Sequence, residues 1–192
     1  MQWSELSGQL QTGDVILFHQ DGLISRLIDL FTDAHYSHVG MVVRQPDGQL
    51  HFWQSFEPEG GVVYDPLPGF LYEYQEKYKG RFVVRRLIVD RTSGMWDALE
   101  KFMAEVKGRP FPSIFGMLSR WVEGLLGIDS GEDEFFCSDL VADSYIKMGL
   151  LPDRPPPNFY APKNFATGKR MHLERGASYT EQIPIELAPQ QA

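Results

Sequence analysis

Alternating and continuous apolar runs divide the first half of the chain into short strands. The run Val15–Phe18 follows Gly13 and Asp14 and is rich in β-forming residues, which predicts a buried strand. Residues 37–44 and 49–55 flank Gln45-Pro46-Asp47-Gly48, whose order fits a type I turn followed by a left-handed glycine. These two runs therefore predict a β-hairpin in which Gln45 faces Gln49. Further strands are expected over residues 62–64, 81–89 and 183–187.

Helical spacing of apolar residues dominates the second half of the chain. It predicts helices over residues 93–106, 113–126 and 137–149, with Ser93 as the cap of the first. An earlier helix is expected over residues 22–31, capped by Asp21, and residues 66–78 have room for a turn or two. Three consecutive prolines favour an extended conformation in residues 153–164. Strands that lead and helices that follow indicate an α+β fold, which we expect to form one domain over residues 1–192.

The predicted hairpin sorts its side chains onto two faces, because successive residues of a strand point to opposite sides. Gln54 falls opposite Gly40 and diagonal to His38, at about 7–8 Å along the backbone. We expect the missing side chain of Gly40 to leave room for Gln54 to lean toward the imidazole. One face carries His38, Gly40, Val42, Phe52 and Gln54, and the other carries Val39, Met41, Val43, His51 and Trp53.

Charge and hydropathy exclude some classes of partner. The chain has 18 basic and 26 acidic residues and a net charge of −8, which disfavours binding to nucleic acid and to anionic bilayers. No run of about 18 apolar residues is present, so we expect no membrane span. The N-terminal residues lack a basic region followed by an apolar stretch, so no signal peptide is expected and a cytoplasmic location is predicted.

Cys137 is the single cysteine, so an internal disulfide is impossible. A lone cysteine is more often a small buried apolar residue than a nucleophile. Cys137 opens a predicted helix, however, where the helix dipole favours a thiolate and lowers the thiol pKa. The free N–H groups there also suit a developing oxyanion. The three acidic residues before it, Glu132, Asp133 and Glu134, oppose a lowered thiol pKa. Cys137 can therefore be either a buried apolar residue or a nucleophile.

His38 is the best candidate for a base among the five histidines. It opens a predicted strand, and the Gln54 amide on the same face can fix the tautomer and orientation of its ring, as in a Cys-His-amide triad. The alternative for Gln54 is an ordinary polar residue on a half-exposed strand. His51 points to the opposite face and is rejected as the base. His35 and His38 have no further ligands at a recognisable spacing, so no metal site is expected.

Three segments together resemble the permuted papain-like amidases, the YiiX-like relatives of NlpC-type cell-wall peptidases and of lecithin retinol acyltransferase. They are Gly13-Asp14 with the strand after it, Tyr36-Ser37-His38-Val39-Gly40-Met41-Val42, and Phe135-Phe136-Cys137-Ser138-Asp139-Leu140-Val141. The histidine precedes the cysteine, as in the permuted branch. Residues 159–165 look like the downstream Tyr-x-Pro element of that branch. The resemblance spans about residues 12–167.

The resemblance implies a papain-like fold with a central antiparallel sheet or small barrel packed against helices, and no cofactor. It implies Cys137 as nucleophile and His38 as base, with a third polar residue at Gln54, where related sequences often carry glutamate. Glutamine can hold the ring but cannot offset an imidazolium charge. Asp139 receives no catalytic role, and Tyr160 is expected to line the substrate pocket unless it only packs among aromatic residues.

These observations predict a cysteine-nucleophile hydrolase that cleaves a small amide, such as a peptide or an N-acyl amino acid, through an acyl-enzyme. One alternative is a lipid-directed acyltransferase or thioesterase. The apolar helix around Trp121 to Leu126 supports it, although core packing explains that helix equally well. The other is a catalytically silent binding module on the same fold. Thiol reactivity distinguishes the enzymes from the silent module.

Overall fold

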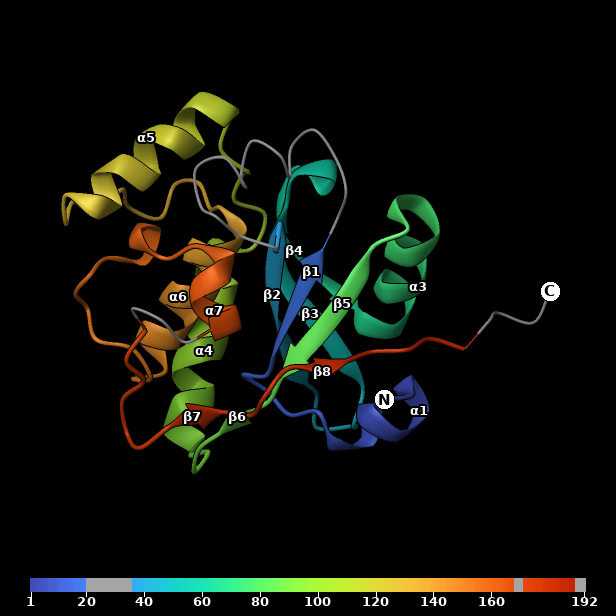
Figure 1. The fold of residues 1–192 in the computed structure, drawn as a ribbon. Helices are drawn as coiled ribbons and strands as arrows, with labels where there is room; N and C mark the ends of the chain where they lie inside the picture. Colours follow the sequence, from blue (N-terminus) through green and yellow to red (C-terminus); the bar gives the residue numbers. More distant parts are fainter. Residues whose placement is uncertain (20–35, 168–170, 189–192) are drawn as a thin grey trace.

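A central antiparallel sheet organises the molecule, in a computed structural model that describes residues 1–19, 36–167 and 171–188 (Figure 1). Its six strands follow the order β4-β3-β2-β1-β5-β8. They are β1 (Val15–His19), β2 (His38–Arg44), β3 (Leu50–Phe56), β4 (Gly61–Pro66), β5 (Arg81–Arg85) and β8 (Ile183–Pro184). Within the described residues the sheet is open, with β4 and β8 at its edges. The prediction of an α+β fold with a central antiparallel sheet is confirmed, and the alternative of a small barrel is wrong.

The β2–β3 hairpin has the predicted register. Met41 pairs with Trp53, and Arg44 pairs with Leu50. The Gln45 N–H donates to the Gln49 carbonyl at 2.8 Å. Gly48 has a φ of +86°, the left-handed conformation that closes this turn and that glycine adopts at low cost.

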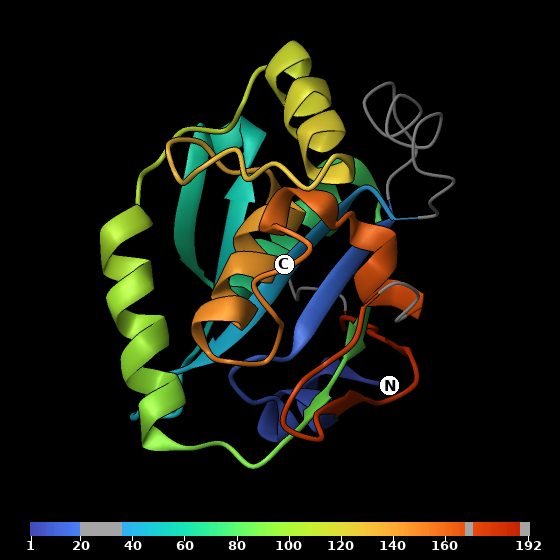
Figure 2. The same ribbon diagram turned by 90° about the vertical axis from the view of Figure 1, so that its left-hand side faces the viewer.

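Each face of the sheet is covered by helices and has its own hydrophobic cluster. Helix α3 (Leu67–Tyr78) covers one face, where the even-numbered side chains of the hairpin meet Phe18 and Tyr74. Helices α4 (Ser93–Val106), α6 (Cys137–Lys147) and α7 (Pro162–Thr167) lie on the other side, against the odd-numbered side chains (Figures 1 and 2). We call these the α3 face and the α6 face.

The remaining elements surround this frame. Helix α5 (Ile114–Leu125) begins where the Ser113 hydroxyl accepts a hydrogen bond from the Gly116 N–H at 3.1 Å. The N-terminus forms α1 (Trp3–Leu6), and β6 (Leu87–Ile88) pairs with β7 (Ser178–Tyr179) in a separate two-stranded sheet. Short 3₁₀ turns cover Ser7–Gln9, Glu57–Glu59 and Pro157–Phe159. No helix of the described part is long and apolar enough to cross a membrane.

Several predicted elements differ in extent. Residues 66–78 form the full 12-residue helix α3 rather than a turn or two. The expected strand over residues 81–89 divides into β5 and β6, because the Arg86 N–H donates to the Thr180 hydroxyl and the Leu87 N–H to the Asp14 carboxylate. Thr92, not Ser93, is the cap residue of α4.

Three more predictions concern the rest of the chain. Residues 153–164 are not extended throughout, because they contain a 3₁₀ turn and the start of α7. The edge strand expected over residues 183–187 is the two-residue β8. The helix expected over residues 22–31 lies outside the described residues.

Candidate functional site

His38 and Gln54 meet on the α3 face of the hairpin. His38 is the first residue of β2, and its Nε2 lies 2.8 Å from Gln54 Oε1 on β3. His38 is 6% exposed and Gln54 is fully buried. The cross-strand contact predicted from the hairpin register is therefore present, and Gln54 is not a half-exposed strand residue.

Aromatic rings enclose the His38 imidazole. The rings of Phe18, Phe52 and Phe56 lie 5.4, 6.3 and 5.2 Å from it, centroid to centroid. Burial lowers the pKa of His38 to about 4, and the hydrogen bond to Gln54 acts in the opposite direction. The imidazole is therefore neutral at pH 7 and has one ring nitrogen free of a proton, as a general base requires.

Gly40 has a different function from the predicted one. A Cβ atom at this position would lie 2.3 Å from Cζ of Phe52, which is far closer than atoms can pack. The missing side chain therefore makes room for the Phe52 ring.

The structure places Cys137 at the first position of α6, as predicted. Two hydrogen bonds fix this helix on β3. The Ser55 hydroxyl donates to the Phe135 carbonyl at 2.6 Å, and the Trp53 indole N–H donates to the Ser144 hydroxyl at 3.1 Å. The start of α6, and with it Cys137, is thereby held against the strands that carry His38 and Gln54.

The sulfur of Cys137 is deeply buried, with only 1% of the residue exposed. Burial raises the pKa of the thiol to about 12, and the Asp139 carboxylate adds to the increase. The backbone N–H groups of Val39, Ser138 and Cys137 itself favour the thiolate but are outweighed. The helix start does favour the thiolate, as predicted, but the cost of desolvating a thiolate exceeds this effect, so the expectation of a lowered thiol pKa is wrong.

His38 and Cys137 both adjoin Val39, but their side chains belong to opposite faces of the sheet. The Val39 N–H faces the sulfur, and Val39 directly follows His38. Within the described part of the chain, the hydrogen bond of the His38 ring goes to Gln54 and not to the sulfur. Strand alternation directs the ring into the cluster of the α3 face, whereas Cys137 belongs to the cluster of the α6 face.

Asp139 has a structural function beside the cysteine. Its Oδ2 accepts hydrogen bonds from the Phe136 N–H at 3.3 Å and from Arg120 Nε at 3.4 Å. Burial raises its pKa to about 6, against the effect of the Arg120 guanidinium. These contacts cap the first turn of α6.

Tyr160 is 2% exposed, and its ring packs beside Phe159 and Phe165. Its carbonyl accepts a hydrogen bond from the hydroxyl of Ser138, the residue after Cys137, at 2.7 Å. The downstream segment is thus tied to the start of α6. Contact between Tyr160 and a substrate stays a prediction.

Sequence reasoning missed Asp65, which extends the polar contact across a third strand. Gln54 Nε2 donates to Asp65 Oδ2 at 3.3 Å. Gln54 pairs with Val63 and Phe52 pairs with Asp65, so Asp65 is diagonal to Gln54 on the same face. The turn between β3 and β4 sets this register, and its sequence carries no signal as clear as the Pro-Asp-Gly turn of the first hairpin.

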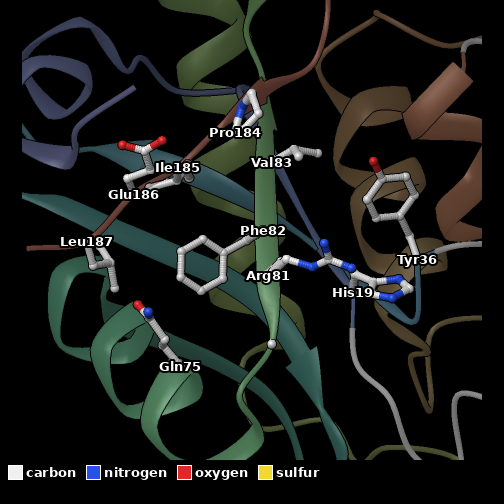
Figure 3. A pocket seen from close by; sticks show the side chains of 11 residues that line it. His19, Tyr36, Gln75, Arg81, Phe82, Val83, Pro184, Ile185, Glu186 and Leu187 are labelled. Carbon is white, nitrogen blue, oxygen red and sulfur yellow. The ribbon is translucent and has the colours of Figure 1, made fainter.

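A cavity of about 710 Å³ lies at the edge of the sheet opposite β4, next to β5 and β8. In Figure 3, His19, Tyr36 and Arg81 lie on one side of β5, while Gln75, Phe82 and Leu187 lie on the other. The cavity therefore extends around the strand, and none of Cys137, His38 and Gln54 lines it.

Metal-ligating residues do not cluster in the described ranges. No group of three or more His, Cys, Asp or Glu lies close enough together there to hold a metal ion. His38 and Cys137 alone are too few for the four ligands of a structural zinc site or the three of a catalytic one.

Known proteins provide two comparisons. The chain is 29% identical over 138 residues to the uncharacterized protein YiiX of Escherichia coli (strain K12), and the match covers 71% of this chain and 58% of YiiX. No model of a protein family matches the sequence. The crystal structure of a protein described as metalloprotein yiiX, from Escherichia coli O157:H7, superimposes with a TM-score of 0.52 at 24% identity, over 71% of this chain and 65% of that one.

The chain thus spans less than two thirds of the length of either relative. Sequence similarity and fold agree on the same relationship, since both comparisons lead to YiiX proteins. The chain is similar to YiiX in sequence and shares its fold over about 71% of its length.

Proposed function

We propose that this chain is a cysteine-nucleophile amidase of the permuted papain-like kind, which cleaves a small amide through an acyl-enzyme. The observation that carries the proposal is the buried 2.8 Å contact between His38 and Gln54, on the strand whose next N–H group faces the sulfur of Cys137. A neutral imidazole held by an amide and a thiol at a helix start are the groups that thiol-based acyl transfer requires. The reaction also requires the His38 ring to turn from the α3 face to within hydrogen-bonding reach of the sulfur.

The two pKa shifts define how the reaction begins. Because the thiol pKa is raised to about 12 and the His38 pKa is lowered to about 4, the resting pair is a neutral thiol and a neutral imidazole. His38 therefore removes the thiol proton as the sulfur attacks the carbonyl, in place of a preformed thiolate–imidazolium pair. Gln54 keeps the ring oriented during this transfer.

The remaining steps complete the exchange of the acyl group. The attack forms a carbon–sulfur bond and moves negative charge to the carbonyl oxygen, which the N–H of Cys137 at the start of α6 can stabilise. Collapse breaks the carbon–nitrogen bond, and His38 returns its proton to the departing amine. Water, activated by His38, then cleaves the thioester and restores the thiol.

Similarity to YiiX and the order of histidine before cysteine support placing the chain in the permuted papain-like branch. The described residues do not supply a ligand set for the metal that the description of the YiiX crystal structure implies. The proposed reaction accordingly uses only the side chains named above.

A lipid-directed acyltransferase or thioesterase is the second candidate, and helix α5 favours it. Phe115 is 86% exposed on this helix and Leu126, just after it, is 71% exposed, while Leu118, Val122 and Leu125 are each at least 39% exposed. Large exposed apolar side chains along one short helix are typical of surfaces that contact other molecules. A long acyl chain is one substrate with which such a surface is compatible.

The single cysteine makes a direct test possible. The protein is incubated with N-acyl amino acids and with activated esters of short and long acyl chains, and its intact mass is measured after acid quenching. We expect the mass of one acyl group on the wild type, removed by hydroxylamine as a thioester is, and none on Cys137→Ala. Amine release from the amides tests turnover, and preference for long-chain esters over amides would favour the second candidate.

A silent binding module gives a different result in the same experiment. In that case no donor acylates the wild type faster than it acylates Cys137→Ala. Similar unfolding of the two proteins in urea would show that both are folded. That outcome would contradict the proposal.

A further inference from the structure

Three side chains form a continuous polar line across three neighbouring strands. The line runs diagonally across the α3 face, from His38 on β2 through Gln54 on β3 to Asp65 on β4. Two hydrogen bonds of 2.8 and 3.3 Å join the three side chains. From this line we infer that Asp65 is a positioning residue: its carboxylate fixes the orientation of the Gln54 amide, which in turn holds the proton of neutral His38 on Nε2 and leaves Nδ1 as the basic atom. The inference deepens the proposed function, because it identifies what prepares the base of the same site.

The carboxylate of Asp65 can only accept hydrogen bonds when it is ionised, so the amide group beside it must present its NH₂. Rotating the amide of Gln54 by half a turn would bring Oε1 against the carboxylate of Asp65, with two acceptors facing each other. Gln54 is fully buried, so water cannot relieve that repulsion. Asp65 is itself half-buried, which limits the screening of its charge.

The orientation of the amide decides the tautomer of His38. A carbonyl oxygen accepts hydrogen bonds, so Nε2 of His38 must carry the proton for the 2.8 Å contact to form. The described aromatic neighbours of the ring are the phenyl groups of Phe18, Phe52 and Phe56, which carry no hydrogen-bond acceptor. Because burial keeps the ring neutral at pH 7, Nδ1 is then the unprotonated nitrogen.

An amide alone would not have this effect. Glutamine presents an acceptor or a donor with equal ease, so Gln54 without Asp65 would stabilise either tautomer of His38. Through Gln54, Asp65 thus places a hydrogen-bond acceptor against His38, as a carboxylate in direct contact with the histidine would do by itself.

The test measures the tautomer directly by NMR of protein labelled with ¹⁵N-histidine, which needs no substrate. At pH 7, the neutral His38 ring of the wild type is expected to carry its proton on Nε2 and none on Nδ1. The His38 signals are assigned by their loss in His38→Gln. In Asp65→Asn the neighbour can donate to Gln54 Oε1, so we expect a mixed or reversed tautomer. Asp47→Asn, at the turn of the same hairpin, is the matched control and is expected to leave the tautomer unchanged.

The same variants are then compared in the acylation assay. We expect Asp65→Asn to slow acylation of Cys137 by about 10- to 100-fold, as is usual for residues that orient a functional group, and Asp65→Glu to restore part of the rate. A wild-type His38 protonated on Nδ1, or an Asp65→Asn variant with an unchanged tautomer, would overturn the inference even if Cys137 is acylated. A fixed Nε2–H tautomer without acylation of any donor would instead retain the inference and contradict the proposed function. Should Asp65→Asn fail to fold, Asp65→Ala takes its place, and an unchanged tautomer in that variant would overturn the inference as well.

Discussion

Two histidines on one hairpin have different environments, and only one of them is a candidate base. His38 and His51 lie on neighbouring strands but on opposite faces. His38 has a buried amide partner at 2.8 Å. His51 stacks on Tyr64 with the ring centroids 4.5 Å apart, and among the described residues its buried Nδ1 has no hydrogen-bond partner. The residue type is the same, so the cross-strand partner is what distinguishes the two.

The two faces of the hairpin differ in the same way. The α6 face is a packing surface, on which Trp53 is fully buried and holds Ser144 of α6. The α3 face combines aromatic packing with the polar line from His38 to Asp65. One face therefore positions the helix that carries Cys137, and in the proposed mechanism the other prepares the base.

Replacing each histidine in turn by glutamine is the strongest test of the difference between His38 and His51. His38→Gln should slow acylation of Cys137 by about 10²- to 10⁴-fold, because it removes the general base. His51→Gln should change the rate by less than about twofold and serves as the matched control. Rates come from the appearance of the acylated mass over time. Equal losses in the two variants would show that the difference between the faces has no bearing on catalysis.

Truncation on the α6 face should instead affect stability. Trp53→Ala removes a fully buried indole, so we expect a loss of about 3–5 kcal/mol in the free energy of unfolding, measured by urea denaturation. The exposed Leu126→Ala should cost less than about 0.5 kcal/mol. A loss below about 1 kcal/mol for Trp53→Ala would contradict the packing function of this face.

The burial of His38 predicts a dependence of stability on pH. Its pKa in the folded state is about 4, below the 6.5 of an exposed histidine, so the unfolded chain binds more protons between these values. Wild type should therefore lose up to about 3 kcal/mol relative to His38→Gln as the pH falls from 6.5 to 4. Comparing the two proteins cancels the opposite contributions of Asp139 and Asp143, whose pKa values are raised. A difference independent of pH would show that folding does not lower the pKa of His38.

Gly40 gives the smallest of these effects. The Cβ of Gly40→Ala would meet the Phe52 ring, so we expect a loss of about 1–3 kcal/mol from overpacking. The double variant Gly40→Ala with Phe52→Leu should recover part of that loss in urea denaturation. No recovery would mean that Phe52 is not the group that Gly40 accommodates.

The sequence predicts the hairpin and its contact between His38 and Gln54 because a local turn sets the register. Val15–His19 and the start of α6 were also predictable from apolar patterns alone. The position of Asp65 depends on the turn between β3 and β4, and the division of residues 81–89 depends on Asp14 and Thr180, which are distant in sequence. The raised thiol pKa cannot be predicted from the helix start, because the burial of Cys137 comes from side chains across the whole α6 face.

The pH dependence of single-turnover acylation of Cys137 tests the central claim most directly. If neutral His38 removes the proton from a neutral thiol, the rate rises through a pKa of about 4 and is level near neutral pH, and His38→Gln abolishes this level region. A rate that instead increases tenfold with each pH unit up to pH 10, identically in wild type and His38→Gln, would show a thiol that reacts without the imidazole and would contradict the account.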